Sequence, residues 1–257
     1  MAHLPGISKK WYRATMKPKV IVFASGTKDG GGSGFENLAN ATKTGVLDAE
    51  IIAVVSNHES GGVRAKAERL GIPFVYFPGP YGAEHYQAIL RDIDERMAPK
   101  NGVAISGLTP WSQSDFTGWV ALSGWLKKVQ GLDSQKTFNI HPALLSFDHG
   151  RFGGPGLYGH HVHEAVKAAF DAGEISESGV SMHFVTDEYD RGPVFFEYRV
   201  PLQKGMSADD IAKAVNAAEH EWQPKITNMV MRGEISWDGK DPKSLEVPEG
   251  YRYLPRA

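Results

Sequence analysis

The feature of this sequence that most constrains its fold is a regular alternation of short apolar runs with segments that favour helices. The apolar runs are rich in β-branched and aromatic residues, which predicts strands at residues 19–25, 50–56 and 73–77. Segments that favour helices lie between and after these runs, at residues 35–44, 63–70 and 84–97. Strands and helices that alternate in this rhythm form βαβ units with parallel strands. We therefore predict an α/β fold with a single doubly wound, mostly parallel twisted sheet and helices on both faces.

The middle of the chain is less regular. Residues 102–106 and 119–123 both resemble strands, and a polar, proline-containing stretch separates them. We place residues 119–123 in the sheet and interpret residues 101–118 as an insertion that precedes this strand. A further strand is predicted at residues 137–141, where Pro142 ends it.

The last part of the sheet is expected to change direction. A glycine-rich loop at residues 148–159 leads into a predicted helix at residues 160–172. Two late strands follow, at residues 180–186 and 193–200. Because a short connection separates them, they can pair as an antiparallel extension of the sheet.

A long helix is expected near the C-terminus. Residues 207–210, Ser-Ala-Asp-Asp, resemble a capping box, and the helix runs from there towards Arg232. Pro224 predicts a kink or an interruption within it. We expect one domain at residues 18–235, with an N-terminal arm at residues 1–17 and an irregular C-terminal tail at residues 236–257.

Composition excludes several classes of protein. The 257 residues include no cysteine, which excludes disulfide scaffolds, cysteine nucleophiles and thiolate zinc sites. The net charge of −2 lacks the basic surplus of a typical nucleic-acid-binding protein. The longest apolar runs are too short to span a bilayer, and the N-terminus lacks the apolar core of a secretory signal. We expect a cytoplasmic monomer or homodimer that acts on small molecules and binds neither nucleic acid nor membrane.

The first candidate site is the glycine-rich loop at residues 26–34, which follows the first strand. Its backbone N–H groups and the start of the next helix could hold a phosphate, or the loop could be only a flexible turn. It is not a Walker loop, and Asn37 stands where a dinucleotide fingerprint requires glycine.

The second candidate is the pair Asn139 and His141. Residues two apart on a strand project to the same side, so a carboxamide and an imidazole would lie together. This pair suits acyl transfer, because the amide can stabilise an oxyanion while the imidazole exchanges a proton. The alternative is a polar strand end whose side chains bind local backbone.

Two further clusters contain titratable residues. His183 leads into an acidic turn with Asp187, Glu188 and Asp190, where a carboxylate could orient the imidazole, or the turn could simply be solvated. His160 and His163 could share a helix face and bind a metal, but the His-Glu-x-x-His pattern is absent. Histidines at a helix start more commonly form hydrogen bonds or line a site, and we expect no metal.

Three segments, in this order, resemble the phosphoribosylglycinamide formyltransferase family. Residues 139–145, Asn-Ile-His-Pro-Ala-Leu-Leu, look like the family's Asn-Ile-His-Pro-Ser-Leu-Leu, and residues 155–165 and 178–190 look like the loop, helix, strand and acidic loop that follow. The resemblance covers roughly residues 19–232 and implies a Rossmann-like formyltransferase fold. It also implies transfer of a formyl group from the cosubstrate 10-formyltetrahydrofolate to the amine of glycinamide ribonucleotide, a step of purine biosynthesis.

Other functions stay open beside this one. The acceptor could be another amine, such as an amino sugar nucleotide, or water, which would make the protein a formyltetrahydrofolate hydrolase. A ligand-binding or regulatory protein on the same scaffold is a non-enzymatic alternative, because fold does not fix function. Such a protein could lose Asn139, His141 or Asp190, and all three are present.

The resemblance also implies roles for individual residues. Asn139, protonated His141 and Asp190 match the catalytic trio, and His183 matches a histidine that lines the site. The acceptor side corresponds to Gly32, Ser33, Gly34, Phe35, Glu36, Asn216 and Glu219. The folate side corresponds to Lys66, Trp125, Leu126, Lys127, Val185, Thr186 and Asp187. This chain departs from the family's usual residues at Gly34 (asparagine), Lys127 (arginine), Ser146 (proline) and Asn216 (glutamine).

Overall fold

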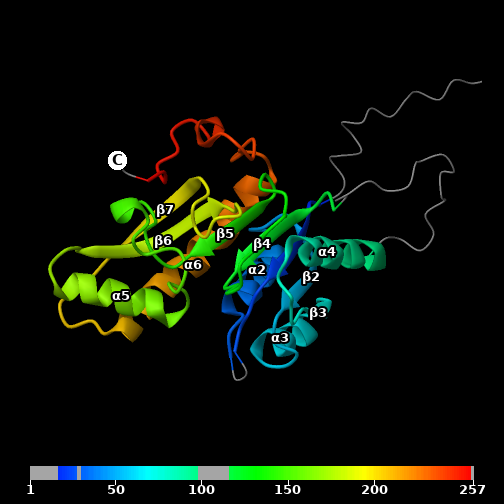
Figure 1. The fold of residues 1–257 in the computed structure, drawn as a ribbon, viewed down its shortest axis with the longest axis horizontal. Coiled ribbons are helices and arrows are strands. Elements are labelled where there is room, and N and C mark those ends of the chain that lie inside the picture. Colours follow the sequence, from blue (N-terminus) through cyan, green and yellow to red (C-terminus); the bar gives the residue numbers. More distant parts are fainter. Residues whose placement is uncertain (1–16, 28–29, 98–115, 256–257) are drawn as a thin grey trace, which may run out of the picture.

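A computed structural model describes residues 17–27, 30–97 and 116–255. The N-terminal arm up to residue 16 and residues 101–115 of the expected insertion, including the strand-like run 102–106, lie outside the described residues. The described part forms a seven-stranded sheet in the order β3-β2-β1-β4-β5-β6-β7 (Figure 1). The strands are β1 (Lys19–Phe23), β2 (Glu50–Ser56), β3 (Phe74–Tyr76), β4 (Trp119–Ser123), β5 (Thr137–His141), β6 (Glu177–Phe184) and β7 (Val194–Pro201).

The direction of the strands changes once along the sheet. All pairs from β3 to β5 are parallel, whereas β6 pairs antiparallel with β5 and β7 pairs antiparallel with β6. The predicted α/β class, the mostly parallel sheet and the antiparallel extension are therefore confirmed. Residues 119–123 form the sheet strand β4 as predicted.

Helices cover both faces of the sheet because the strands are apolar on both sides. In β1, Val20 and Val22 belong to one core cluster, whereas Ile21 and Phe23 belong to the other. The first cluster contains residues of α2 (Ser33–Thr44), α3 (Gly62–Leu70), α5 (His160–Asp171) and α6 (Ala208–Met231). The second contains residues of α4 (Ala83–Met97). A strand whose successive side chains are all buried reads as a continuous apolar run, which is why these strands are visible in the sequence.

Helix α6 begins at the predicted cap, where Ser207 and Asp210 form a complete capping box. The helix then continues through Pro224, so of the predicted kink or interruption the interruption is absent. Proline has no N–H to donate to the carbonyl four residues earlier, which leaves the carbonyl of His220 free. The side-chain amide of Asn37 on α2 donates to that oxygen at 2.7 Å. A neighbouring helix thus satisfies the group that the proline releases.

The segment after α6 packs against the sheet. Trp237 is buried beside Phe184, and the ring of Tyr253 contacts Phe196 and Trp222. Apart from a short 3-10 turn at Pro242–Ser244, this segment has little regular structure, and it runs alongside β7 (Figure 1). Among the described residues, no helix is both long enough and apolar enough to cross a membrane.

Candidate active site

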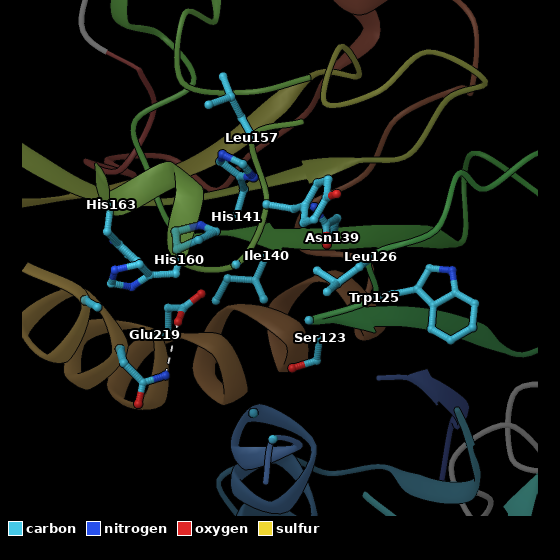
Figure 2. Close-up of a pocket in the computed structure, with 18 of the residues that line it drawn as sticks. Ser123, Trp125, Leu126, Asn139, Ile140, His141, Leu157, His160, His163 and Glu219 are labelled. Carbon is cyan, nitrogen blue, oxygen red and sulfur yellow. Dashed lines mark hydrogen bonds between the residues drawn. The ribbon is translucent and has the colours of Figure 1, made fainter. Parts of the chain in front are cut away.

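A cavity of about 660 Å³ lies at the carboxyl ends of β1, β4 and β5. Open α/β sheets commonly bind ligands at this edge. The cavity is lined by the glycine-rich loop after β1, by Ser123 and the residues that follow β4, and by the end of β5. Helices α5 and α6, which pack on each other, complete its wall, and Figure 2 shows side chains from several of these elements around it.

Four of the predicted site residues meet at one place in this region. Asn139 on β5 is the register partner of His183 on β6, and the amide Nδ2 of Asn139 lies 3.1 Å from Nε2 of His183. Asp190 approaches both histidines, with Oδ1 3.4 Å from His183 Nε2 and Oδ2 3.8 Å from His141 Nδ1. Residues that are up to 51 positions apart in sequence therefore form one polar cluster.

The imidazole of His141 is buried, with an exposed fraction of 4%. Its Nε2 lies 2.7 Å from the carbonyl oxygen of Phe152, so Nε2 carries the proton and donates it. Nδ1 is the nitrogen that faces Asp190. Burial lowers the pKa of His141 below its ordinary value, although the Asp190 carboxylate and the Phe152 carbonyl act in the opposite direction. The imidazole is therefore neutral at rest, whereas the family resemblance implies the protonated form.

The position of Asp190 depends on an unusual backbone conformation. Its φ angle of 50° lies in the left-handed region, which few non-glycine residues adopt. The Gly154 amide donates to Oδ2 at 2.9 Å. Burial alone raises the pKa of a carboxyl group, but the two nearby imidazoles and the Gly154 amide hold the pKa of Asp190 well below its ordinary value. Asp190 is therefore a permanent anion beside His141.

The glycine-rich loop forms the opposite part of the wall. Gly31, Gly32, Ser33 and Gly34 line the cavity, and α2 begins there, so unpaired N–H groups of its first turn lie at the cavity. A Cβ atom on Gly34 would lie only 2.2 Å from Oγ of Ser123. Ser123 is itself bonded to the buried amide of Gln223, whose Nε2 lies 3.1 Å from its Oγ. A buried polar pair therefore occupies the space that a side chain at position 34 would need.

Two residues predicted for the acceptor side, together with Lys66, are not among the described residues that line the cavity. The ring of Phe35 is buried in the core. Glu36 forms a hydrogen bond with Arg69 and an ion pair with Lys66 at 3.8 Å. Lys66 was predicted on the folate side, but it lies on α3 beside Gly32. The geometry at these three positions fits a structural role at the start of α2.

The predicted folate side is brought to the cavity only in part. Trp125 and Leu126 line it, but Lys127 does not, and its ammonium group lies 5.7 Å from the centre of the Tyr81 ring. Val185, Thr186 and Asp187 are also absent from the cavity lining in the described structure. Asp187 instead accepts a hydrogen bond from the Gly131 amide. Of the predicted folate-side residues, only Trp125 and Leu126, which follow β4, are among the described residues that line the cavity.

Helix α6 contributes Asn216 and Glu219, two residues of the predicted acceptor side, to the cavity wall. The Asn216 amide donates to Oε2 of Glu219 at 3.3 Å. Burial raises the pKa of Glu219 to about 7, and the Asn216 hydrogen bond offsets this effect only partly. Glu219 can therefore change its charge near neutral pH.

Several cavity residues were not selected from the sequence, namely Tyr158, Tyr189, His220 and Gln223. His160 and His163 also line the cavity. The sequence singled them out by their spacing on one helix face, as residues that could bind a metal or, more commonly, line a site. Within residues 17–27, 30–97 and 116–255, no three His, Cys, Asp or Glu side chains are arranged to hold a metal ion.

Comparisons with known proteins agree with this geometry. A sequence model of the family described as formyl transferase matches residues 127–227, the segment that carries Asn139, His141 and Asp190. Phosphoribosylglycinamide formyltransferase from Escherichia coli is 29% identical over 84% of this chain and 88% of its own length. The chain is a formyltransferase similar to these proteins.

Two further phosphoribosylglycinamide formyltransferases are similar to this chain. The chloroplastic phosphoribosylglycinamide formyltransferase from Arabidopsis thaliana is 29% identical over 86% of this chain, which spans 68% of that protein. The crystal structure of phosphoribosylglycinamide formyltransferase from Anaplasma phagocytophilum superposes with a TM-score of 0.65 at 25% identity. That superposition covers 93% of this chain and 98% of the other. At the level of the family, the protein is a folate-dependent formyltransferase.

Proposed function

We propose that this enzyme transfers the formyl group of 10-formyltetrahydrofolate to the primary amine of glycinamide ribonucleotide. The main observation in favour is that Asn139, His141 and Asp190 lie in one cavity with the glycine-rich loop and Glu219. A polar catalytic end and an anion-binding end in the same cavity suit an acceptor that carries both an amine and a phosphate. The similar proteins from Escherichia coli and Arabidopsis thaliana are both phosphoribosylglycinamide formyltransferases, which supports the same acceptor.

The reaction begins when the amine nitrogen of the acceptor attacks the formyl carbon. A carbon–nitrogen bond forms, and the carbonyl oxygen becomes the oxyanion of a tetrahedral intermediate. The amide of Asn139 uses one N–H towards His183, which leaves its second N–H to stabilise the oxyanion. A well-placed donor of this kind lowers the activation barrier by roughly 3 kcal/mol. The intermediate collapses when the bond to the folate nitrogen breaks.

We assign to His141 and Asp190 the transfer of the proton that the attacking amine must lose. A neutral imidazole with a free Nδ1 can accept this proton, and the neighbouring carboxylate stabilises the imidazolium that results. Nδ1 and Oδ2 are 3.8 Å apart, too far for a direct hydrogen bond, so an intervening water suits the relay. The imidazolium then returns the proton to the folate nitrogen as it leaves.

The folate cosubstrate is proposed to bind at the Trp125 and Leu126 side of the cavity. Both side chains present apolar surface next to the catalytic cluster, and a flat heteroaromatic ring suits such a wall. The acceptor phosphate is proposed to bind the amides at residues 31–34, where the positive end of the α2 dipole also favours an anion.

The test is an absorbance assay of donor deformylation with and without glycinamide ribonucleotide. Acceptor-dependent turnover is expected, and Asp190→Asn should lower kcat/KM by roughly a hundredfold to ten-thousandfold. Glu188→Gln is the matched control, because this exposed carboxylate lies in the same loop outside the cavity lining of the described structure. Equal turnover without acceptor would indicate a hydrolase, and no turnover with this acceptor would contradict the proposal.

A further inference from the structure

The segment that follows β5 returns to the residue at which it begins. β5 ends at His141, and eleven positions later the carbonyl oxygen of Phe152 lies 2.7 Å from Nε2 of His141. This contact holds the proton on Nε2 and leaves Nδ1 free on the side of Asp190. The place of residues 142–152 therefore determines which nitrogen of His141 can accept a proton.

Side chains of β6 and β7 hold the middle of this segment. The amide of Leu145 donates to Oγ of Ser181 at 2.9 Å, and the Ser181 hydroxyl donates to the carbonyl of Ala143 at 2.7 Å. The amide of Ser146 donates to Oε1 of Glu197 at 2.9 Å, and its hydroxyl donates to Oε2 at 2.7 Å. Both carboxylate oxygens of Glu197 thus bind one residue, which fixes the backbone and the side chain of that residue together.

The register of the sheet brings Glu197 to this segment. Ser181 on β6 is the partner of His141 on β5 and also of Glu197 on β7, and these three strands are neighbours (Figure 1). Partners in antiparallel pairs project to the same face, so the three side chains form a row. Glu197 is buried, and burying a carboxylate is costly unless donors surround it. A buried polar network that is satisfied in this way holds the chain in one arrangement.

We propose that Glu197 is a positioning residue for the formyl transfer. By holding Ser146, it keeps the carbonyl of Phe152 on Nε2 of His141, so that Nδ1 stays free to accept the proton of the attacking amine. Glu197 is not among the described residues that line the cavity, so it acts through Ser146. This inference rests on the proposed function, because that function gives His141 the role of the base. Neither the sequence motifs nor the family resemblance assigns a role to Glu197.

The first test is kinetic. Glu197→Leu removes both acceptors and keeps a side chain of similar size. Its kcat with 10-formyltetrahydrofolate and glycinamide ribonucleotide should fall by about tenfold to a hundredfold, because the base is no longer in place. Both KM values should stay within about twofold of the wild type. In Glu197→Gln the side-chain carbonyl can accept from the Ser146 amide and the NH2 group can donate to the Ser146 hydroxyl, so kcat should return to within about threefold of the wild type.

The second test reads the tautomer of His141. Without the Phe152 carbonyl, the carboxylate of Asp190 is the acceptor that remains beside the ring, and the proton should move to Nδ1. NMR of protein whose histidine rings carry a nitrogen isotope label distinguishes the two tautomers, and His141→Asn assigns the signals. The wild type and Glu197→Gln should carry the proton on Nε2, whereas Glu197→Leu should carry it at least partly on Nδ1. This measurement needs no substrate, so it decides the inference even if glycinamide ribonucleotide is not formylated, an outcome that would contradict the proposed function alone.

Glu177→Gln is the matched control, because Glu177 is a carboxylate on β6 that pairs with Arg199 on β7. It should leave kcat and the tautomer unchanged. Ser146→Pro removes both donors to Glu197, and the φ angle of −72° at Ser146 suits proline, so this variant decides the test where Glu197→Leu does not fold. It should show the same loss of kcat and the same change of tautomer. Either variant, if it folds and keeps its kcat, or loses kcat while the proton stays on Nε2, would overturn the inference.

Discussion

At the scale of single residues, two carboxylates of the same cavity are shifted in opposite directions. Asp190 accepts from the Gly154 amide and lies near two imidazoles, which keep its pKa below the ordinary value despite burial. Among the described residues, Glu219 has only the Asn216 amide as a hydrogen-bond partner, and burial raises its pKa to about 7. The number of donors around each carboxylate, rather than its burial alone, decides whether it is charged at neutral pH.

This difference predicts how Glu219 affects stability. Between the ordinary pKa of 4.5 and the folded value of about 7, the folded protein holds a proton that the unfolded chain has released. Its stability therefore falls as the pH rises through this window. Glu219→Gln removes this dependence, so the stability of the variant relative to the wild type should be about 2–3 kcal/mol greater at pH 8 than at pH 5. Urea unfolding at both pH values measures the gain, and a pH-independent difference would contradict it.

Two departures from the family pattern are explained by contacts that sequence alone does not reveal. Ser146, where the family usually has proline, donates from both its amide and its hydroxyl to the buried carboxylate of Glu197, at 2.9 and 2.7 Å. Proline offers neither donor. Gly34 is required because Ser123 fills the space beside it. Glu197 and Ser123, the residues that explain these two departures, are distant in sequence from Ser146 and Gly34. The departures were therefore visible in the sequence, but the contacts that explain them were not.

At the scale of elements, α6 depends on α2 for one of its backbone hydrogen bonds. Asn37→Ala removes the donor to the His220 carbonyl and should destabilise the protein by about 1–2 kcal/mol. In a Pro224→Ala background the new amide at position 224 can bind that carbonyl, so Asn37→Ala should cost clearly less there. Chemical unfolding of the wild type, both single variants and the double variant measures this coupling. Equal costs in the two backgrounds would show that the Asn37 contact does not compensate for the proline.

The sequence predicts the elements well where a strand is buried on both sides or where a cap marks a helix. β2 and β5 have the predicted bounds, and α6 begins at the predicted capping box. The continuation of α6 through Pro224 was not predictable, because it relies on a side chain from another helix. The same reason applies to Lys66, whose position depends on how α3 packs beside α2.

At the scale of the whole molecule, the active site exists only because the sheet brings distant segments together. The resemblance to known motifs selected Asn139, His141, His183 and Asp190, and the structure places all four in one cluster. It could not select His220 or Gln223, because their place in the cavity wall comes from the packing of α6. The residues of the catalytic cluster are therefore recovered from sequence, whereas these two residues of α6 are not.

The segment after α6 links the edge of the sheet to the catalytic region, which leads to a last prediction. The carbonyl of Tyr253 accepts from the amide of Glu197 at 2.6 Å, and the side chain of Glu197 holds the turn at Ser146, close after His141. Ending the chain at Pro248 removes Tyr253 and its contacts with Phe196 and Trp222.

The truncated protein should lose roughly 2–4 kcal/mol of stability, which corresponds to a fall in Tm of about 5–15 °C. Calorimetry measures this fall, and Arg252→Ala serves as the control, because its exposed side chain lies in the same segment. Since the Glu197 carboxylate keeps its bonds to Ser146 and Ser181, kcat should change by less than about tenfold well below the new Tm. An unchanged Tm would show that this segment does not stabilise the fold. A fall in kcat of much more than tenfold well below the new Tm would show that the segment holds the turn at Ser146 directly.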